Sequence, residues 1–242
     1  MCHRTEAADV SPTRQSLHDA DPSARRALRA ALSLLPSAPG IVVAYAGLAV
    51  VTVVSNTLGN LVSAVVLGAA IVLAAGALGL DTDARNSLGV RLLLAVIAAI
   101  VAGIAIIIGF VFLVLPGVYL AVRLVVAAVV LEDCGPLEAL GRSLESTAGE
   151  GWTVFGVWLA TTLLNAAVAG AVTLLLLGGV PALDTRAGLV ALQNALPLAA
   201  ALGTFVSGPV TAASDAVLYG WFADAMPDED ASNAATSGVR AP

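Results

Sequence analysis

Chemistry-bearing side chains are scarce within the apolar segments of this sequence. Arg123 and Asp215 are the only ionisable residues set deep inside such segments. An ionised side chain in the hydrocarbon of a bilayer is costly, and it is usually paired or functional. Arg123 precedes Glu132 by nine residues and Asp215 precedes Asp224 by nine, so two helices running in the same direction would hold both charges at one depth. We therefore predict a structural ion pair between Arg123 and Asp215; a functional intramembrane charge site is the alternative.

Three amide side chains also fall within apolar segments, at Asn165, Gln193 and Asn194. An amide in hydrocarbon must find a hydrogen-bond partner, which a neighbouring helix commonly supplies. We expect interhelical hydrogen bonds at these positions. A polar path for a substrate is the alternative.

No residues are arranged as a catalytic, cofactor or metal site. His3 and His18 both lie in the polar N-terminal segment, where solvated side chains are the expected state. No carboxylate pair, phosphate-binding loop, HExxH or GxSxG pattern occurs. Cys2 and Cys134 fit no metal or redox spacing, and we interpret them as free thiols. The sequence therefore predicts no enzymatic activity, no cofactor and no bound metal.

The composition is typical of an integral membrane protein. Of 242 residues, 59% are hydrophobic and 12% are charged, whereas about 25% are charged in an ordinary soluble domain. Every basic residue is an arginine, and the net charge is −6, which resembles the acidic proteins of halophiles. Because no basic stripe is available to neutralise phosphates, nucleic acid is not an expected partner.

The apolar stretches predict an all-α, polytopic bundle of about six transmembrane helices. A span needs roughly 20 apolar residues, and the candidate stretches are 40–55, 61–80, 88–115, 118–131, 152–177 and 189–222. Asn56, Gly59 and Asn60 predict a tight turn between the first two spans. This hairpin opens the predicted membrane domain, which we assign to residues 36–224.

The sixth stretch is too long to be straight, and we expect kinks at Pro197 and at Gly208-Pro209. Small residues four positions apart allow helices to approach closely in lipid. Such pairs occur at Ala99 and Gly103, Ala166 and Gly170, and Ala199 and Gly203. They favour a compact bundle.

Three further segments flank or interrupt the spans. Residues 1–21 form a polar tail without the apolar region of a signal peptide, and residues 225–242 form an acidic tail; we expect both to be disordered. Residues 137–146 read as a short amphipathic cytoplasmic helix between spans 4 and 5, with one apolar side made by Leu137, Leu140 and Leu144. We expect that side to lie against lipid or the bundle.

Residues 22–35 predict an amphipathic helix ahead of the first span. Leu28, Leu32 and Leu35 fall on one side of it, and three arginines, Arg25, Arg26 and Arg29, fall on another. This pattern suits a helix that lies in the membrane interface. A cytosolic extension of the first span is the alternative.

The arginines predict the orientation of the chain. Six spans place both termini on one side, where nine arginines would lie, whereas Arg186 alone falls in the opposite loops. Cytoplasmic loops carry an excess of basic residues. We therefore expect a multi-pass protein of the cell membrane with both termini in the cytoplasm. Trp152 and Trp221 would then lie at the inner interface, which tryptophan prefers.

Residues 115–159 combine a span ending in Pro-Gly, a span that carries an arginine, an acidic break, a short helix, and a tryptophan entering the next span. The pattern rests on Pro116, Gly117, Arg123, Glu132, Asp133, Gly135, Ala139, Leu140, Ser143, Gly149 and Trp152, with Tyr219 near the last span's end. It resembles the membrane domain attached to some glycerophosphoryl diester phosphodiesterases and its stand-alone prokaryotic relatives. The resemblance implies a six-helix bundle. The phosphodiesterase activity of the fused proteins belongs to a separate barrel domain, and this chain has no such domain.

These observations favour a non-enzymatic membrane module that organises lipids or partner proteins. Its expected partners are the lipid bilayer and a membrane or cytoplasmic protein, which the helix at 137–146 would contact. A small transporter or permease-like subunit is the alternative, and it would need a polar cavity around Arg123, Asn165 and Asp215.

Overall fold

The computed structural model describes residues 23–80, 87–111, 127, 131, 135, 137–139, 141, 143, 149–180 and 184–223. All regular structure among them is helical. The elements are α2 (Ala24–Leu34), η1 (Leu35–Ser37), α3 (Pro39–Val54), α4 (Asn56–Ala77), α5 (Leu88–Val111), α8 (Gly151–Leu177) and α9 (Arg186–Ala223). The two predicted tails, Arg123, both cysteines and both histidines lie outside the described residues.

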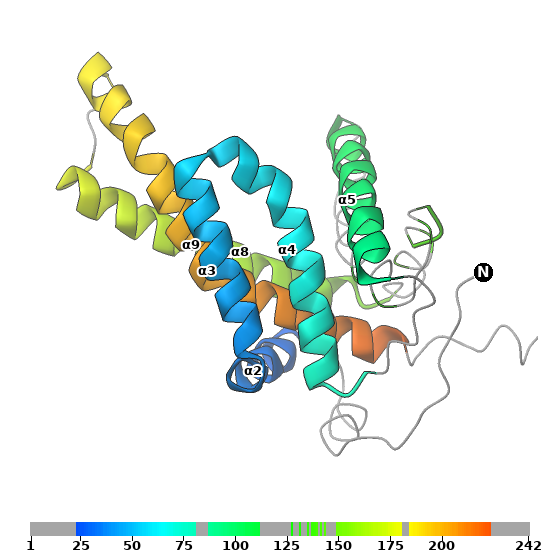
Figure 1. Ribbon diagram of the computed structural model, residues 1–242. Coiled ribbons are helices and arrows are strands. Elements are labelled where there is room, and N and C mark those ends of the chain that lie inside the picture. The colour runs from blue at the N-terminus through cyan, green and yellow to red at the C-terminus, as the bar shows by residue number, and fades with distance from the viewer. Residues whose placement is uncertain are drawn as a thin grey trace, which may run out of the picture.

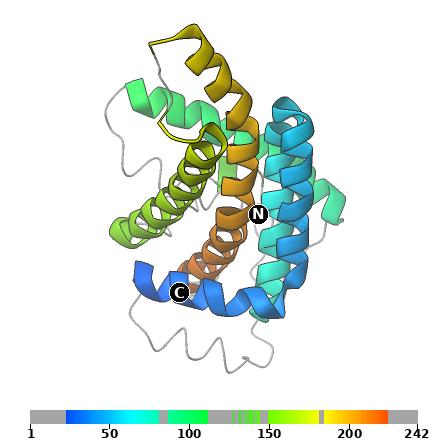
Figure 2. The ribbon, with the colours of Figure 1, turned by 90° about the vertical axis from the view of Figure 1, so that its left-hand side faces the viewer.

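Helix α2 meets α3 at a sharp bend. The segments Ala24–Ser37 and Pro39–Val54 are bent by 91° relative to each other. Proline cannot donate a backbone hydrogen bond, and Pro36 lies in η1 while Pro39 begins α3. Because of this bend, α2 is not a straight extension of the first span. Figure 2 shows it lying across the end of the bundle.

Helices α3 and α4 form a hairpin with a single residue, Ser55, between them. The Ser55 hydroxyl oxygen caps α4 by accepting a hydrogen bond from Leu58 N at 3.3 Å. A Cβ at Gly59 would lie 2.8 Å from the Cα of Thr52, so the missing side chain lets the two helices approach. The turn predicted at Asn56, Gly59 and Asn60 is therefore wrong in detail: these residues form the start of α4, because the serine cap begins the helix earlier.

Two helices are long and apolar enough to cross a membrane, Gly151–Leu177 and Arg186–Phe222. A third candidate arises if the bent pair formed by α2, η1 and α3 counts as one span. Within α4 and α5, the apolar stretches Val62–Ala77 and Leu88–Val101 are shorter. The described residues thus indicate an all-helical membrane protein, and they do not establish six spans.

Helix α9 is the centre of the bundle. It packs against α8, α3, α4 and α2, whereas α5 packs against α4 (Figure 1). Its helical structure continues through both Pro197 and Pro209, and its course curves in Figure 2. The residues from 207 to 218 are almost all buried, while the first half of α9 is largely exposed. Residues near the C-terminal half of α9 are therefore the ones that the bundle encloses.

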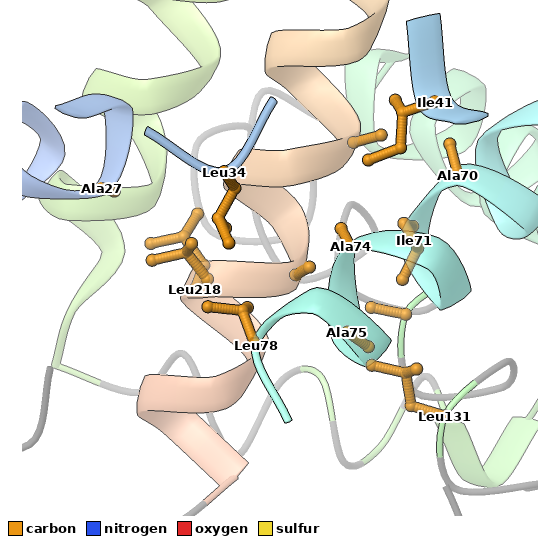
Figure 3. Packing of buried hydrophobic residues seen from close by; sticks show 14 of the residues in the cluster. Ala27, Leu34, Ile41, Ala70, Ile71, Ala74, Ala75, Leu78, Leu131 and Leu218 are labelled. Carbon is orange, nitrogen blue, oxygen red and sulfur yellow. The ribbon is translucent and has the colours of Figure 1, made fainter. Parts of the chain in front are cut away.

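The core gathers at the end of the bundle where α3 begins, α4 ends, α8 begins and α9 ends; we call this the α2 end. Leu34, Leu78 and Leu218 point toward one another there, from α2, the end of α4 and α9 (Figure 3). Most other core side chains are alanines, among them Ala27, Ala70, Ala74, Ala75, Ala212 and Ala216. Small side chains let helix backbones approach closely, which supplies the packing attraction that holds helices together in lipid.

The bundle-facing sides of both amphipathic helices are made largely by small residues. In α2, Ala27, Ala31 and Leu34 are buried, while Leu32 is 55% exposed. In the segment at 137–143, whose described residues 137–139, 141 and 143 are helical, Ala139 and Ser143 are buried and Leu137 is 76% exposed. Small residues form these contacts because they permit the closest approach. The side chains of Leu140 and Leu144 lie outside the described residues.

Candidate intramembrane polar seam

The polar residues of the apolar helices form a seam between α8 and α9. Four-residue spacing brings successive positions to one side of a helix. Asn165 and Ala169 of α8 meet Gly203 and Ser207 of α9. The same spacing continues to Thr161 and Thr173 on α8 and to Ala199, Thr211 and Asp215 on α9, turning gradually around each helix. We use the name polar seam for these nine residues.

Asn165 is the residue of the seam that links the two helices. The Ser207 hydroxyl donates to Asn165 Oδ1 at 3.3 Å and to Gly203 O of its own helix at 2.9 Å. With one proton shared between two acceptors, the bond across the helices is the longer one. Asn165 therefore makes an interhelical hydrogen bond, one of the two roles considered from the sequence.

Gly203 makes this approach possible. A Cβ at Gly203 would lie 2.5 Å from Asn165 Oδ1 and 3.1 Å from Asn165 O, closer than side-chain carbons normally come. Gly170, in the equivalent small-residue pair on α8, has nothing within 4 Å of such a Cβ. Of these two glycines, Gly203 alone lies at a helix contact, so the Ala199 and Gly203 pair marks a close approach and the Ala166 and Gly170 pair does not.

The remaining hydroxyls of the seam are satisfied within their own helices. Thr211 donates to Ser207 O at 3.0 Å, Thr161 to Trp158 O at 3.0 Å, and Thr173 to Ala169 O at 2.8 Å. Back-bonding of this kind satisfies a hydroxyl where water is absent. These threonines need no ligand to complete their hydrogen bonding.

Ser214 and Asp215 lie where α9 enters the core. Asp215 is 1% exposed and Ser214 is fully buried, and the Ser214 hydroxyl has no hydrogen-bond partner. A buried hydroxyl without a partner costs free energy and is uncommon. Because Arg123 lies outside the described residues, its pairing with Asp215 stays a prediction.

A second close contact fixes α3 against α9. A Cβ at Gly208 would lie 2.8 Å from Cζ of Tyr45 and closer still to other atoms of its ring. Tyr45 is 4% exposed. The sequence indicated Gly208 as part of a kink; its role in seating an aromatic ring has no signal in the local pattern.

Gln193 and Asn194 lie away from the seam, and both side chains are exposed. Helix α9 has 38 residues, a length of about 57 Å at 1.5 Å per residue, whereas the hydrocarbon core of a bilayer is about 30 Å thick. If the C-terminal end of α9 lies at the inner interface, its first turns extend beyond the hydrocarbon, where amides are solvated.

Two further residues differ from their sequence interpretation. Arg91, one of the nine arginines assigned to the cytoplasmic side, lies in the first turn of α5 and is 6% exposed. Trp152 is 84% exposed, whereas Trp221 is 8% exposed and belongs to the core. Of the two tryptophans assigned to the interface, Trp152 therefore has the exposure that an interfacial anchor needs.

Among the described residues, no three His, Cys, Asp or Glu side chains gather as metal ligands. No family model matches the chain, and no curated protein or solved structure matches it. The hydrogen bonds described along the seam join amide, hydroxyl and backbone carbonyl groups, and Gly203 leaves room for the contact between α8 and α9.

Proposed function

We propose that the chain is a polytopic membrane module of about six spans that organises lipids or partner proteins and has no catalytic site of its own. The observation that carries this proposal is the hydrogen bond between Ser207 and Asn165 across α8 and α9. Asn165, the most polar side chain in the middle of α8, joins α8 to α9. A transporter would use such a group to line a water-filled path.

The arrangement of the helix ends supports a cytoplasmic α2 end. Arg25, Arg26 and Arg29 belong to α2, and Arg186 lies at the start of α9, at the far end of the α8 and α9 hairpin. Basic residues concentrate on the cytoplasmic side. We therefore propose a cell-membrane location with both termini in the cytoplasm.

The exposed surface supports a lipid or protein partner for the spans. Many large apolar side chains of α8 and α9 are exposed, including Leu163, Leu174, Leu175, Leu196 and Val206. An apolar surface of this extent is unusual on a water-soluble protein and normal on one that faces lipid or another membrane protein. The segment at 137–146 remains our proposed contact for a cytoplasmic partner.

A small transporter or permease-like subunit is the second candidate. Ser214 favours it, because a buried hydroxyl without a partner beside the buried Asp215 suits a polar site that a ligand completes. In that case water should reach this part of α9.

Thiol labelling in the membrane separates the two candidates. In a background with Cys2 and Cys134 replaced by serine, we would introduce Asn165→Cys or Ser214→Cys and add a small membrane-permeant reagent that reacts with the hydrated thiolate. Ser87→Cys, at an exposed helix start, is the reactive control, and Ala166→Cys, exposed beside Asn165 on α8, is the lipid-facing control. A packed module predicts reaction at position 87 and none at 165, 166 or 214. Reaction at 165 or 214 at the rate of position 87 would contradict the module and favour the transporter.

A further inference from the structure

The outer side of α2 carries a concentration of positive charge. Arg25, Arg26 and Arg29 are all exposed, and no acidic residue occurs in α2 or η1. Arg25 and Arg26 lie in the first turn, where the helix dipole disfavours positive charge. The Ser23 side chain makes no capping hydrogen bond there. The positive charge of the arginines and the helix dipole both favour an anion beside this turn.

The packing of α2 gives it three distinct sides. Ala27, Ala31 and Leu34 face the bundle and are buried. At 100° per residue, Leu28, Leu32 and Leu35 form the next side, on which Leu28 and Leu35 are partly buried against the core and Leu32 is 55% exposed. Arg25, Arg26 and Arg29 occupy the remaining side. Three such sides suit a helix that contacts protein, lipid and water at once.

The position of α2 matches the level of a membrane surface. A Cβ at Gly156, in the second turn of α8, would lie 2.7 Å from the Cβ of Ala24, so α2 crosses α8 near its start. At its other end, Leu34 contacts the core near Leu218 (Figure 3). The bend of 91° sets α2 across α3, in the orientation of a helix that lies on the surface its neighbour crosses.

Aromatic rings mark the same level on α8. Trp152 and Phe155 meet edge to face with ring centroids 5.9 Å apart, and Phe155 lies 5.5 Å from Trp158. Trp152 is 84% exposed. Amphipathic aromatic side chains are enriched where headgroups meet hydrocarbon. The rings and the arginines therefore lie near one plane, at the α2 end.

We propose that the arginine side of α2 binds the phosphate groups of anionic phospholipids in the inner leaflet. This proposal rests on the orientation proposed above and deepens it by naming a ligand class. Exposed arginine guanidinium groups donate charge-assisted hydrogen bonds to phosphate, and anionic lipids concentrate in the cytoplasmic leaflet. The exposed Leu32 faces the acyl chains while the arginines reach the headgroups.

The test is a lipid titration of the purified full chain in neutral detergent, read as the midpoint of thermal unfolding. Phosphatidylglycerol should raise the midpoint, and phosphatidylcholine or inorganic phosphate at the same concentration should not. Arg25→Gln, Arg26→Gln and Arg29→Gln should each raise the phosphatidylglycerol needed for half the effect about fivefold, and all three together should raise it roughly a hundredfold. The triple lysine variant should retain most of the response.

Arg186→Gln, at the other end of the bundle, is the matched control and should titrate like the wild type. If the triple glutamine variant needed no more phosphatidylglycerol than the wild type for half the effect, the proposed headgroup site would be wrong. That result would leave the proposed packing of α8 against α9 unaffected. Equal stabilisation by inorganic phosphate would also overturn the headgroup site, because a soluble anion would then be the ligand. If the triple variant fails to fold, the three single variants decide the question. Water reaching Asn165 would overturn the proposed module and leave this titration unchanged.

Discussion

The hydroxyl oxygen of Ser207 lies 3.3 Å from Oδ1 of Asn165, and Gly203, one turn away on α9, leaves the room for that contact. The pair joins α8 to α9 where neither helix has a charged residue to hold it. In hydrocarbon, an amide that lost this partner would find no water to replace it. The seam is therefore a specific helix contact and a constraint on how α8 and α9 can slide.

Substitutions at this pair should couple. We expect Asn165→Ala and Ser207→Ala each to lower the free energy of unfolding in detergent by about 1 kcal/mol. The double variant should lose less than the sum by about 0.6 kcal/mol, the typical worth of an interhelical hydrogen bond in a membrane protein. Thr173→Val, which removes a hydroxyl bonded within α8, is the control and should couple to neither. Strict additivity would show that the contact contributes nothing.

The two small-residue pairs on α8 and α9 should respond in opposite ways to one added methyl group. Gly203→Ala forces a Cβ against Asn165, and we expect a loss of about 1 to 3 kcal/mol because neither backbone can retreat without opening the seam. Gly170→Ala adds its Cβ in open space and should be neutral or slightly stabilising, since alanine favours helix. Thermal unfolding of both variants in the same detergent measures the difference. Equal effects would mean that Gly203 lies at no tight contact.

Hydropathy located α3, α8 and α9 within a few residues of their observed bounds, because a run of apolar residues must be helical to satisfy its backbone in lipid. Hydropathy could not predict which side of each helix packs against the bundle. The leucine spacing indicated an interfacial helix for α2 and an apolar side against lipid or the bundle for residues 137–146, but it did not show which residues pack on the bundle. Next to lipid, Leu32 loses nothing by facing outward, whereas Ala27 and Ala31 gain contact by facing inward.

The sequence predicted one residue of the polar seam and missed its partner. Asn165 stood out in the sequence because an amide is rare in an apolar helix, and the structure gives it an interhelical partner. Its partner Ser207 did not stand out, because a serine can satisfy itself against its own helix. The contact of Gly208 with Tyr45 joins α9 to α3 across a long stretch of chain, and no local spacing reports such a contact.

Arg123 and Asp215 should be energetically coupled if they pair. Asp215 is buried in α9 at 1% exposure, so a charge there requires compensation. We expect the stability losses of Arg123→Ala and Asp215→Ala, added together, to exceed the loss of the double variant. Additive losses would leave Arg123 without this partner and would shift weight toward the transporter candidate.

The three-sided arrangement of α2 should be visible to spin labels. A nitroxide on Leu32→Cys should be relaxed more strongly by oxygen, which dissolves in lipid, and one on Arg29→Cys by a water-soluble nickel complex. Ala31→Cys, on the buried side, should be protected from both. Position 32 responding mainly to nickel would place α2 in water and contradict its interfacial position.

Impermeant thiol labelling of intact cells tests the orientation of the spans most directly. The cysteine-free chain would carry one cysteine at Val180, which is 87% exposed in the turn after α8, or at Ser87, exposed at the start of α5. Cysteines at Thr13 and Ser237 report the two terminal segments. We predict labelling of position 180 in intact cells, and labelling of positions 13, 87 and 237 only after the membrane is permeabilised. Labelling of position 87 in intact cells, or protection of position 180, would contradict a polytopic module with a cytoplasmic α2 end.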